Sequence, residues 1–590
     1  MTEFMLSTNK AVMRTPHCFG KLGIEGLYCL IEGNPLIVEG MIYDDIGIKT
    51  KEDVYKKILH GHVDGVYNVL FYDVEEEKLY IRNDELAVLP IYICKNGNEI
   101  YVSNNVWKII KNINILNIDK KILFMHFEIF NIVDKNRTFF SDISTLTAGS
   151  LCIIDINNFS ITEKEYARDE ALPLSIKMSL QDMAMMMDAN LKRNYKIYKR
   201  KIGSKYVFFG NSGGLDSRLV PYYAQWAGIN ICGITIGEEY EKENIQTSTF
   251  HNAGMISSMY GFRNYKIPYD TGDWWSRFLL DIRNAPFIVS DMFKNPYAGF
   301  PDEQIARINI TGKPDHVVGI VGFKPQLYDA MLAAPAHLRL ERVCTLLCGI
   351  FARNELRHIL PQIPKGMAAS HLHDWLQDHA EADVLTLIKR IMRVIISKHT
   401  PSCGGLEACS RLLFPIQHYY PHVHRFAFSY GGKEVFTERK VLEELISMKF
   451  KALAQLPTQK NQFISTTKVA GSEEEWSYLQ LRGNGMDYTR WGQDTRWRGF
   501  ATEVWSYPSE IFEKLFPGIT LEKLTAHLYP LSVNKFLKIK FMFHLIEGGK
   551  FSLLERDEFT IADRFESFGQ KLIDTDVCLP SDGAVSASDR

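Results

Sequence analysis

The stretch that decides the fold of the second half of the chain is Tyr206-Val-Phe-Phe-Gly-Asn-Ser-Gly-Gly-Leu-Asp-Ser-Arg218. Its apolar start, Val207–Phe209, is typical of a short buried strand. The residues 211–214 are small turn formers, and Leu215–Pro221 begins a helical pattern. The sequence therefore predicts a strand, a glycine turn and a helix in immediate succession.

A strand, glycine turn and helix in this order are suited to binding phosphate. Glycines let the backbone approach an anion, and N–H groups and the hydroxyls of Ser212 and Ser217 can donate hydrogen bonds to it. The amino end of the helix adds positive potential. Asp216 would repel a bare anion, so we expect it to hold a Mg²⁺ ion that bridges phosphate groups. An ordinary glycine turn with a capping serine is the alternative.

The loop sequence resembles the pyrophosphatase-type (PP) loop of the asparagine synthetase superfamily. Enzymes of that superfamily split ATP into AMP and pyrophosphate while they adenylate a carboxylate. The resemblance implies that ATP binds at Ser212, Gly213, Gly214, Leu215, Asp216 and Ser217, with Mg²⁺ on Asp216. These six residues alone also fit related families, including argininosuccinate synthetases and tRNA thiolation enzymes.

The sequence after the loop alternates strands and helices. Ile229–Gly237 is an apolar run typical of a buried parallel strand, 243–260 suits a helix, and Arg263–Pro268 suits the next strand. This order predicts a doubly wound sheet with its ligand at the carboxyl ends of the strands. In the family the end of the second strand contacts adenine through its backbone, which the resemblance assigns here to Ile236 and Gly237.

The first 170 residues contain short alternating apolar runs, which predict a mostly-β layered domain. The expected strands are 36–43, 65–73, 78–82, 90–94 and 99–103, and short helices are expected at 54–59 and 106–111. The order of these pieces resembles the N-terminal glutamine amidotransferase domain of asparagine synthetase, which is of the N-terminal-nucleophile (Ntn) type. The segments that carry the resemblance are Gly65–Asp73, Arg82–Tyr92 and Thr147–Ser150.

Two departures from that domain bear on its activity. Thr2 stands where the family has its nucleophilic cysteine, and the family's Asn-Gly-Glu substrate segment reads Glu39-Gly-Met41. Threonine is an N-terminal nucleophile in other families, so the role of Thr2 stays open. We expect the domain to be inactive as a glutaminase and to serve as packing or as a wall of the synthetase site.

Two segments further along resemble the family's synthetase half. Gln459–Phe463 is similar to a segment whose lysine reaches the pyrophosphate and the reacting carbonyl, which makes Lys460 a catalytic candidate; a surface lysine is the alternative. Val317–Asp329 is the expected counterpart of an acidic, glycine-rich segment that helps to bind Mg²⁺. Lys324 and Pro325 stand where its acids belong, which leaves catalytic competence open.

Composition excludes several classes of protein. The 68 basic and 70 acidic residues nearly balance, so no overall field attracts nucleic acid or an anionic membrane. The ten cysteines contain no C-x-x-C pair, which favours buried free thiols in a reducing cytosol over a metal site. No run reaches membrane-spanning length and the first residues lack a signal-peptide pattern, so we expect a cytoplasmic protein.

Two clusters invite a binding role. Tryptophans from 476 to 505 interleave with arginines, a pattern seen in single-strand nucleic-acid binding, but nearby acids favour a packed lid or subunit contact. His371, His373 and His379 lie near two aspartates, where solvated helix-end residues are favoured over a metal cluster. Methionines in 182–195 are expected to pack in a core.

We therefore predict an α/β protein of two domains. Residues 1–170 form an Ntn-type, mostly-β layered domain, residues 171–575 a doubly wound PP-loop ATP pyrophosphatase domain with helical additions, and residues 576–590 a disordered tail.

The predicted function follows from the resemblance. Superfamily members without a working glutaminase look like β-lactam synthetases, carbapenam synthetases and lasso-peptide cyclases. They use ATP and Mg²⁺ to adenylate a carboxylate, here with Asp216 and Lys460, and transfer it to an amine. The expected partners are a small-molecule or peptide carboxylate and an amine, with a homodimer or a biosynthetic partner protein open. The alternatives are an asparagine synthetase that uses ammonia or glutamine, and a non-catalytic scaffold or regulator.

Overall fold

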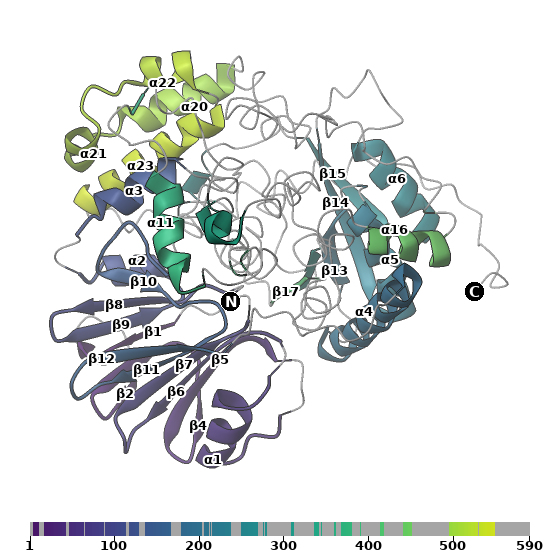
Figure 1. Ribbon diagram of the computed structural model, residues 1–590, viewed down its shortest axis with the longest axis horizontal. Helices are drawn as coiled ribbons and strands as arrows, with labels where there is room; N and C mark the ends of the chain where they lie inside the picture. The colour runs from purple at the N-terminus through teal and green to yellow at the C-terminus, as the bar shows by residue number, and fades with distance from the viewer. Residues whose placement is uncertain are drawn as a thin grey trace.

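The computed structural model places an N-terminal β-sandwich beside a parallel sheet flanked by helices (Figure 1). Apart from short gaps and isolated residues, it describes residues 4–10, 17–42, 46–63, 65–113, 117–128, 136–166, 179–202, 206–237, 249–268, 308–311, 335–341, 367–379, 414–417, 440–450, 495–528 and 530–548. The boundary expected near residue 170 and the tail 576–590 lie outside these ranges.

Two six-stranded antiparallel sheets form the sandwich. The first has the order β10 (Ile143–Thr145), β8 (Tyr92–Asn96), β9 (Glu99–Ser103), β1 (Met5–Ser7), β3 (Leu22–Glu25) and β2 (His17–Phe19). The second has the order β12 (Ser160–Glu165), β11 (Ser150–Asp155), β7 (Lys78–Asn83), β6 (Gly65–Asp73), β5 (Asn34–Ile42) and β4 (Cys29–Ile31). The strands expected at 65–73 and 99–103 are confirmed with the same bounds.

The alternation of side chains along β6 explains the layering. Leu70 and Tyr72 belong to the core between the two sheets, because successive strand residues point to opposite faces. Val69 and Phe71 face the other way and pack against the π-helical turn η2 (Val54–Leu59), which continues α1 (Lys51–Asp53). The expected helix at 54–59 is therefore present as a wider helical turn.

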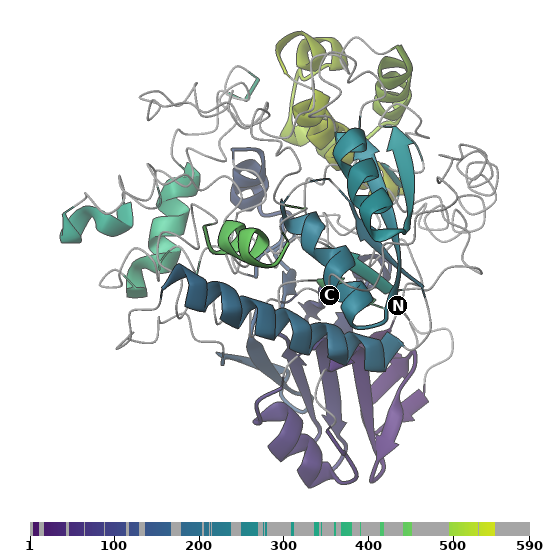
Figure 2. The same cartoon turned by 90° about the vertical axis from the view of Figure 1, so that its right-hand side faces the viewer.

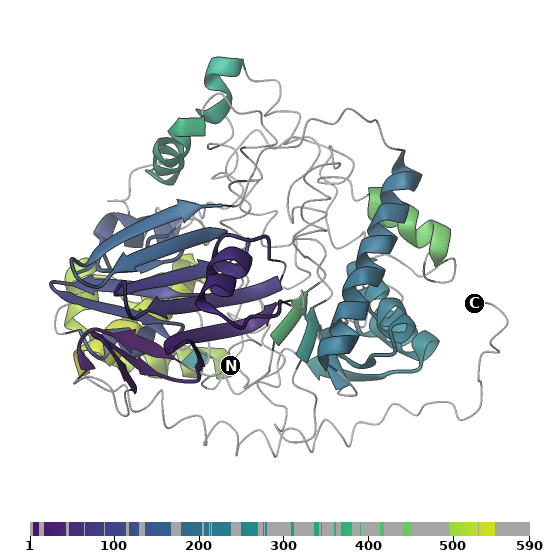
Figure 3. The same cartoon turned by 90° about the horizontal axis from the view of Figure 1, so that it is seen from below.

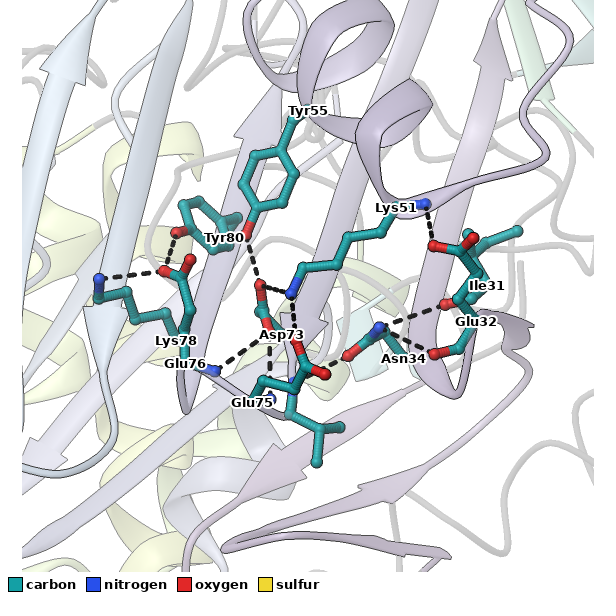
Figure 4. A network of polar contacts seen from close by, with 11 residues as sticks. Ile31, Glu32, Asn34, Lys51, Tyr55, Asp73, Glu75, Glu76, Lys78 and Tyr80 are labelled. Carbon is teal, nitrogen blue, oxygen red and sulfur yellow. Dashed lines mark hydrogen bonds and ion pairs between the residues drawn. The ribbon is translucent and has the colours of Figure 1, made fainter.

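Asp73, the last residue of β6, fastens this outer layer to the sheet (Figure 4). Its side chain is buried and lies 2.7 Å from the ammonium of Lys51, while the hydroxyl of Tyr55 donates to it over 2.7 Å. Burial raises the pKa of Asp73, but these donors and the backbone N–H of Glu76 outweigh it, so the pKa is lower than usual.

The outer face of the first sheet is covered by α2 (Val106–Ile110), by α3 (Lys120–Glu128) and by helices from the far end of the chain, α20 (Thr495–Ser506), α21 (Glu510–Leu515), α22 (Leu521–His527) and α23 (Pro530–Gly548). The rings of Phe127 and Phe536 lie 4.5 Å apart between their centres. The indole N–H of Trp107 donates to the carbonyl of Ile282 over 3.0 Å. One continuous apolar core therefore contains residues of both expected domains.

The second half contains a five-stranded sheet in which every pair is parallel. Its order is β15 (Arg263–Pro268), β14 (Asn230–Gly237), β13 (Tyr206–Gly210), β16 (Ile308–Thr311) and β17 (Phe414–Gln417). The helices of this half include α4 (Leu180–Ile202), α5 (Leu215–Trp226), α6 (Thr249–Tyr260) and α16 (Lys440–Lys449). Figure 2 shows the long α4 beside α16, and Figure 3 shows the sandwich and the parallel sheet side by side.

Helix α4 is tied to its neighbours through one buried carboxylate. Asp188 accepts a hydrogen bond from the hydroxyl of Tyr223 on α5 over 2.9 Å and pairs with Lys192 over 3.0 Å. Of the methionines expected in the core, Met187 is buried, whereas Met185 is exposed. The helix therefore packs on one face only.

Other expectations have mixed outcomes. Trp497 is buried and its indole N–H donates to Asn534, which confirms a packing role for that residue. The expectation of buried thiols is wrong for Cys18 and Cys29, which are exposed on edge strands. Within the described ranges, no group of three or more His, Cys, Asp or Glu residues could hold a metal ion. In the same ranges, no helix combines the length and apolar character needed to cross a membrane.

Candidate functional site

The glycine turn lies where the order of the parallel strands reverses. β13 pairs in parallel with β14 on one side and with β16 on the other. The strands that follow β13 in sequence, β14 and β15, are therefore added on one side of it, and the later β16 and β17 on the other. In open α/β sheets such a switch point is where ligands bind. The chain leaves β13 at Gly210, passes through the turn at 211–214 and enters α5 at Leu215. The predicted strand, turn and helix are thereby brought to this edge.

Gly213 has a backbone conformation and surroundings that suit only glycine. Its φ is +72°, in the left-handed region that side chains disfavour. A Cβ atom placed on Gly213 would lie 2.6 Å from the Cβ of Asn252 and 3.1 Å from the backbone nitrogen of Ala253, both on α6. The turn is therefore pressed against the first half of α6.

Arg218 fixes the orientation of this turn through hydrogen bonds to its backbone. Its guanidinium is fully buried, and its Nε and Nη2 donate to the carbonyl of Gly213 over 3.4 and 3.3 Å. Its Nη1 donates to the carbonyl of Leu453 over 2.7 Å. Burial lowers the pKa of Arg218 from its usual value.

A buried polar network supports the turn from the side of α6. The amide of Asn211 donates to the carbonyl of Ala253 over 3.0 Å and to Asn264 Oδ1 over 3.1 Å. The hydroxyl of Thr235 donates to the carbonyl of Asn211 over 2.7 Å, and Asn264 Nδ2 donates to that hydroxyl over 2.9 Å. The network joins β13, β14 and β15 at the level of the turn.

Sequence reasoning missed this network and Arg218. The signals were present, because Asn211 directly precedes the loop and Arg218 directly follows it. Gly233 is a further signal: a Cβ there would overlap Asn264 Oδ1, so the strand must have a glycine where the asparagine side chain crosses it. Nothing in the local sequence indicates which side chain crosses.

The structure describes the remaining site residues unevenly. Leu215, Asp216 and Ser217 form the first turn of α5, of which the backbone is described. Ile236 and Gly237 end β14 and pair with Ile267 and Pro268, at the same edge as the turn. The residues Thr2, Ser212, Gly214, Lys324, Pro325 and Lys460 lie outside the described residues.

The sequence analysis did not predict β16, which lies beside β13. β16 covers Ile308–Thr311, whereas the sequence analysis placed the strand of the acidic segment at Val317, in a part of the chain outside the described residues. The residues that follow β16 in sequence are Gly312-Lys-Pro-Asp315. The short, polar-interrupted run at 308–311 hid this strand from the apolar pattern.

The structure describes Glu39-Gly-Met41, which the sequence analysis compared with the substrate segment of the resembled family. Glu39 lies in β5 directly opposite Asn68 of β6 and is buried. Its carboxylate accepts hydrogen bonds of 2.8 Å from Asn68 and from Asn104, which follows β9. The described chain starts beside it, because the N–H of Phe4 donates to Asn104 Oδ1 over 3.1 Å. A buried carboxylate here is unsuited to stabilising an anionic intermediate, which requires hydrogen-bond donors.

Comparison with known proteins gives one family and a set of distant structures. One solved structure similar to this chain is the glutamine phosphoribosylpyrophosphate (PRPP) amidotransferase from B. subtilis complexed with ADP and GMP. It is 10% identical, the match covers 38% of this chain and 54% of that one, and the TM-score is 0.17. Another is described as the allosteric regulatory enzyme of purine biosynthesis, with 11% identity, coverage of 36% of this chain and 46% of that one, and a TM-score of 0.15. The chain thus spans about half the length of these structures.

No curated protein sequence matches the chain. The family model for a glutamine amidotransferase domain matches residues 51–167. This range runs from α1 through β6 and β7 to the end of β12. The N-terminal sandwich is accordingly a glutaminase-like domain.

Proposed function

We propose that the protein is an ATP-dependent ligase that forms an amide bond between a carboxylate and an amine. The observation that supports this most is the position of the turn at 211–214, which lies where the strand order reverses. Arg218 donates hydrogen bonds to the backbone of this turn at Gly213. A turn of this kind at this edge suits a nucleotide phosphate. The glutaminase-like sandwich agrees with carbon–nitrogen bond formation.

The reaction that we propose has two steps. An oxygen of the substrate carboxylate attacks the α-phosphorus of ATP, and the bond to pyrophosphate breaks to give an acyl-adenylate. The amine then attacks the acyl carbon, and AMP leaves with the electrons of its bond, which gives the amide after loss of a proton. Peptide N–H groups of the turn would bind the phosphates during the first step.

The chain's residues have distinct roles in this proposal. Ile236 and Gly237 would bind the adenine through the backbone, and Lys460 would offset the charge that grows on the leaving pyrophosphate. Asp216, the second residue of α5, is the acid that would hold Mg²⁺, an ion that neutralises phosphate charge when bound. The fold of the turn fits this assignment, since its Gly213 carbonyl is turned inward to Arg218.

The test is the exchange of labelled pyrophosphate into ATP in the presence of pooled amino acids and cell extract. The wild-type protein should catalyse carboxylate-dependent exchange, and Asp216→Ala should lose it while keeping the wild-type melting temperature. Exchange by neither protein with any pool, together with co-purification of a protein partner, would favour the non-catalytic scaffold instead.

Transfer of the amide nitrogen of glutamine is a second candidate, favoured by the family match at residues 51–167. The buried Glu39 and the threonine at position 2 weigh against it. Release of ammonia from glutamine, abolished by Thr2→Ala, would support this candidate. Amide formation that proceeds with a free amine and without glutamine would support the first.

A further inference from the structure

The Glu39 cluster of the sandwich has hydrogen-bond acceptors in excess of donors. Glu39 on β5, Asn68 on β6 and Asn104 after β9 are joined by the two hydrogen bonds of 2.8 Å described above. Glu39 is 7% exposed and Asn68 is 0% exposed, so water has little access to either side chain. Each carboxylate oxygen has one of these amide donors, although an ionised carboxylate can accept about four hydrogen bonds.

The orientation of both amides is fixed by their other partners. Asn68 Nδ2 donates to Glu39 and also to the carbonyl of Leu89 over 3.2 Å, so this atom must be the nitrogen. Asn104 Oδ1 accepts the N–H of Phe4, so its other atom is the donor to Glu39.

Asn68 Oδ1 then has no hydrogen-bond partner, although it is buried. It belongs to the amide group that contacts the carboxylate, so it lies within about 5 Å of Glu39 by covalent geometry. A buried acceptor without a donor costs about 1–3 kcal/mol unless a ligand or water supplies one.

No described side chain forms an ion pair with the carboxylate of Glu39. Burial raises the pKa of Glu39, while the hydrogen bonds from the amides of Asn104 and Asn68 lower it. A group that brings several N–H donors and one positive charge would satisfy both the free acceptors and the carboxylate.

We propose that Glu39 and Asn68 form a binding site for the primary ammonium group of a free amine. A divalent metal is disfavoured, because one carboxylate and one amide oxygen are too few ligands for it. The site is independent of the ATP site.

The experiment compares thermal unfolding of the full chain in NH₄Cl, KCl and NaCl at equal ionic strength, with methylammonium as a second amine. Ammonium and methylammonium should raise the melting temperature above its value in KCl. Glu39→Gln should lose this difference, and the matched control Glu52→Gln, an exposed acid of the same domain, should keep it. Equal melting temperatures in all the salts, or a shift that persists in Glu39→Gln, would overturn the proposal.

A second variant guards against a misfolded Glu39→Gln protein. Glu39→Asp, which keeps the charge but withdraws the carboxylate by one methylene, should weaken the effect at least threefold. If it responds as strongly as the wild type, the proposed geometry is wrong.

Discussion

Arg218 donates two hydrogen bonds to the carbonyl of Gly213, five residues earlier, and a third to the carbonyl of Leu453, 235 residues later. The first two set the direction of a peptide in the turn, and the third anchors the turn to the segment after α16. A buried guanidinium can do both because its donors form a rigid, planar fork. Arg218 is therefore a positioning residue for the proposed nucleotide site.

The first prediction concerns Arg218 itself. Arg218→Ala removes the hydrogen bonds to the Gly213 carbonyl, so the Gly213 peptide can rotate. Affinity for ATP should therefore fall at least tenfold, about 1.4 kcal/mol. Arg218→Lys keeps the charge but lacks the planar, forked donors of arginine. Its affinity for ATP should therefore lie between those of the wild type and Arg218→Ala. Calorimetric titration with ATP measures this, with Gln225→Ala at the far end of α5 as the control. Unchanged affinity in a folded Arg218→Ala protein would remove Arg218 from the site.

Gly213→Ala is expected to destabilise the protein. An alanine at φ +72° costs about 1–2 kcal/mol, and its Cβ would overlap that of Asn252, which adds a cost of similar size. Gly254→Ala on the facing helix α6 is the matched control, because a Cβ there meets no atom within 4 Å and should stabilise the helix by about 0.5–1 kcal/mol. Urea unfolding distinguishes them, and similar midpoints for both variants would refute the packing described for the turn.

Asp73 should make stability depend on pH in the acid range. Because its pKa is lower when folded, its contribution is present above its ordinary pKa of 3.8 and is lost as the pH falls through the folded value. Asp73→Asn should therefore be less stable than the wild type near neutral pH, by roughly 1–3 kcal/mol, and the difference should shrink below pH 4. Urea unfolding at several pH values measures it. A difference that is constant from pH 7 to pH 3 would contradict the assigned ion pair with Lys51.

The shared core predicts that the two halves unfold together. Phe127 of the sandwich side packs on Phe536 and Phe516 of the C-terminal helices, so Phe127→Ala should cost about 3–5 kcal/mol. In calorimetry, Phe127→Ala should lower the melting temperature of a single unfolding transition that both halves share. Leu30→Ala, at an exposed side chain, should change stability by less than about 0.5 kcal/mol. Two separate transitions in the wild-type protein, of which only one responds to Phe127→Ala, would show that the halves are independent.

The sequence predicted local structure well. β6, β9 and β15 have the expected bounds, because alternating or continuous apolar runs between turn residues indicate strands directly. The turn after β13 was equally legible from its glycines. β16 was missed because it has four residues and an asparagine in its centre.

Contacts between distant segments were beyond reach. Arg218 meets Leu453, and Trp107 meets Ile282, across separations that no local pattern encodes. The resemblance set Glu39 against an asparagine of the family, but the two amide partners of Glu39 come from β6 and from the residue that follows β9. Such partners depend on how the strands are ordered in the sheets, which is decided by the packing of the whole sandwich.

The most direct test of the central claim is calorimetric titration of the wild-type protein and Asp216→Ala with an ATP analogue that cannot be cleaved between its α- and β-phosphates, in the presence of Mg²⁺. We predict one site per chain in the wild type and an affinity at least tenfold weaker in the variant. Absence of binding by the wild type at millimolar analogue, or equal binding by a folded Asp216→Ala protein, would contradict a nucleotide site at the turn after β13.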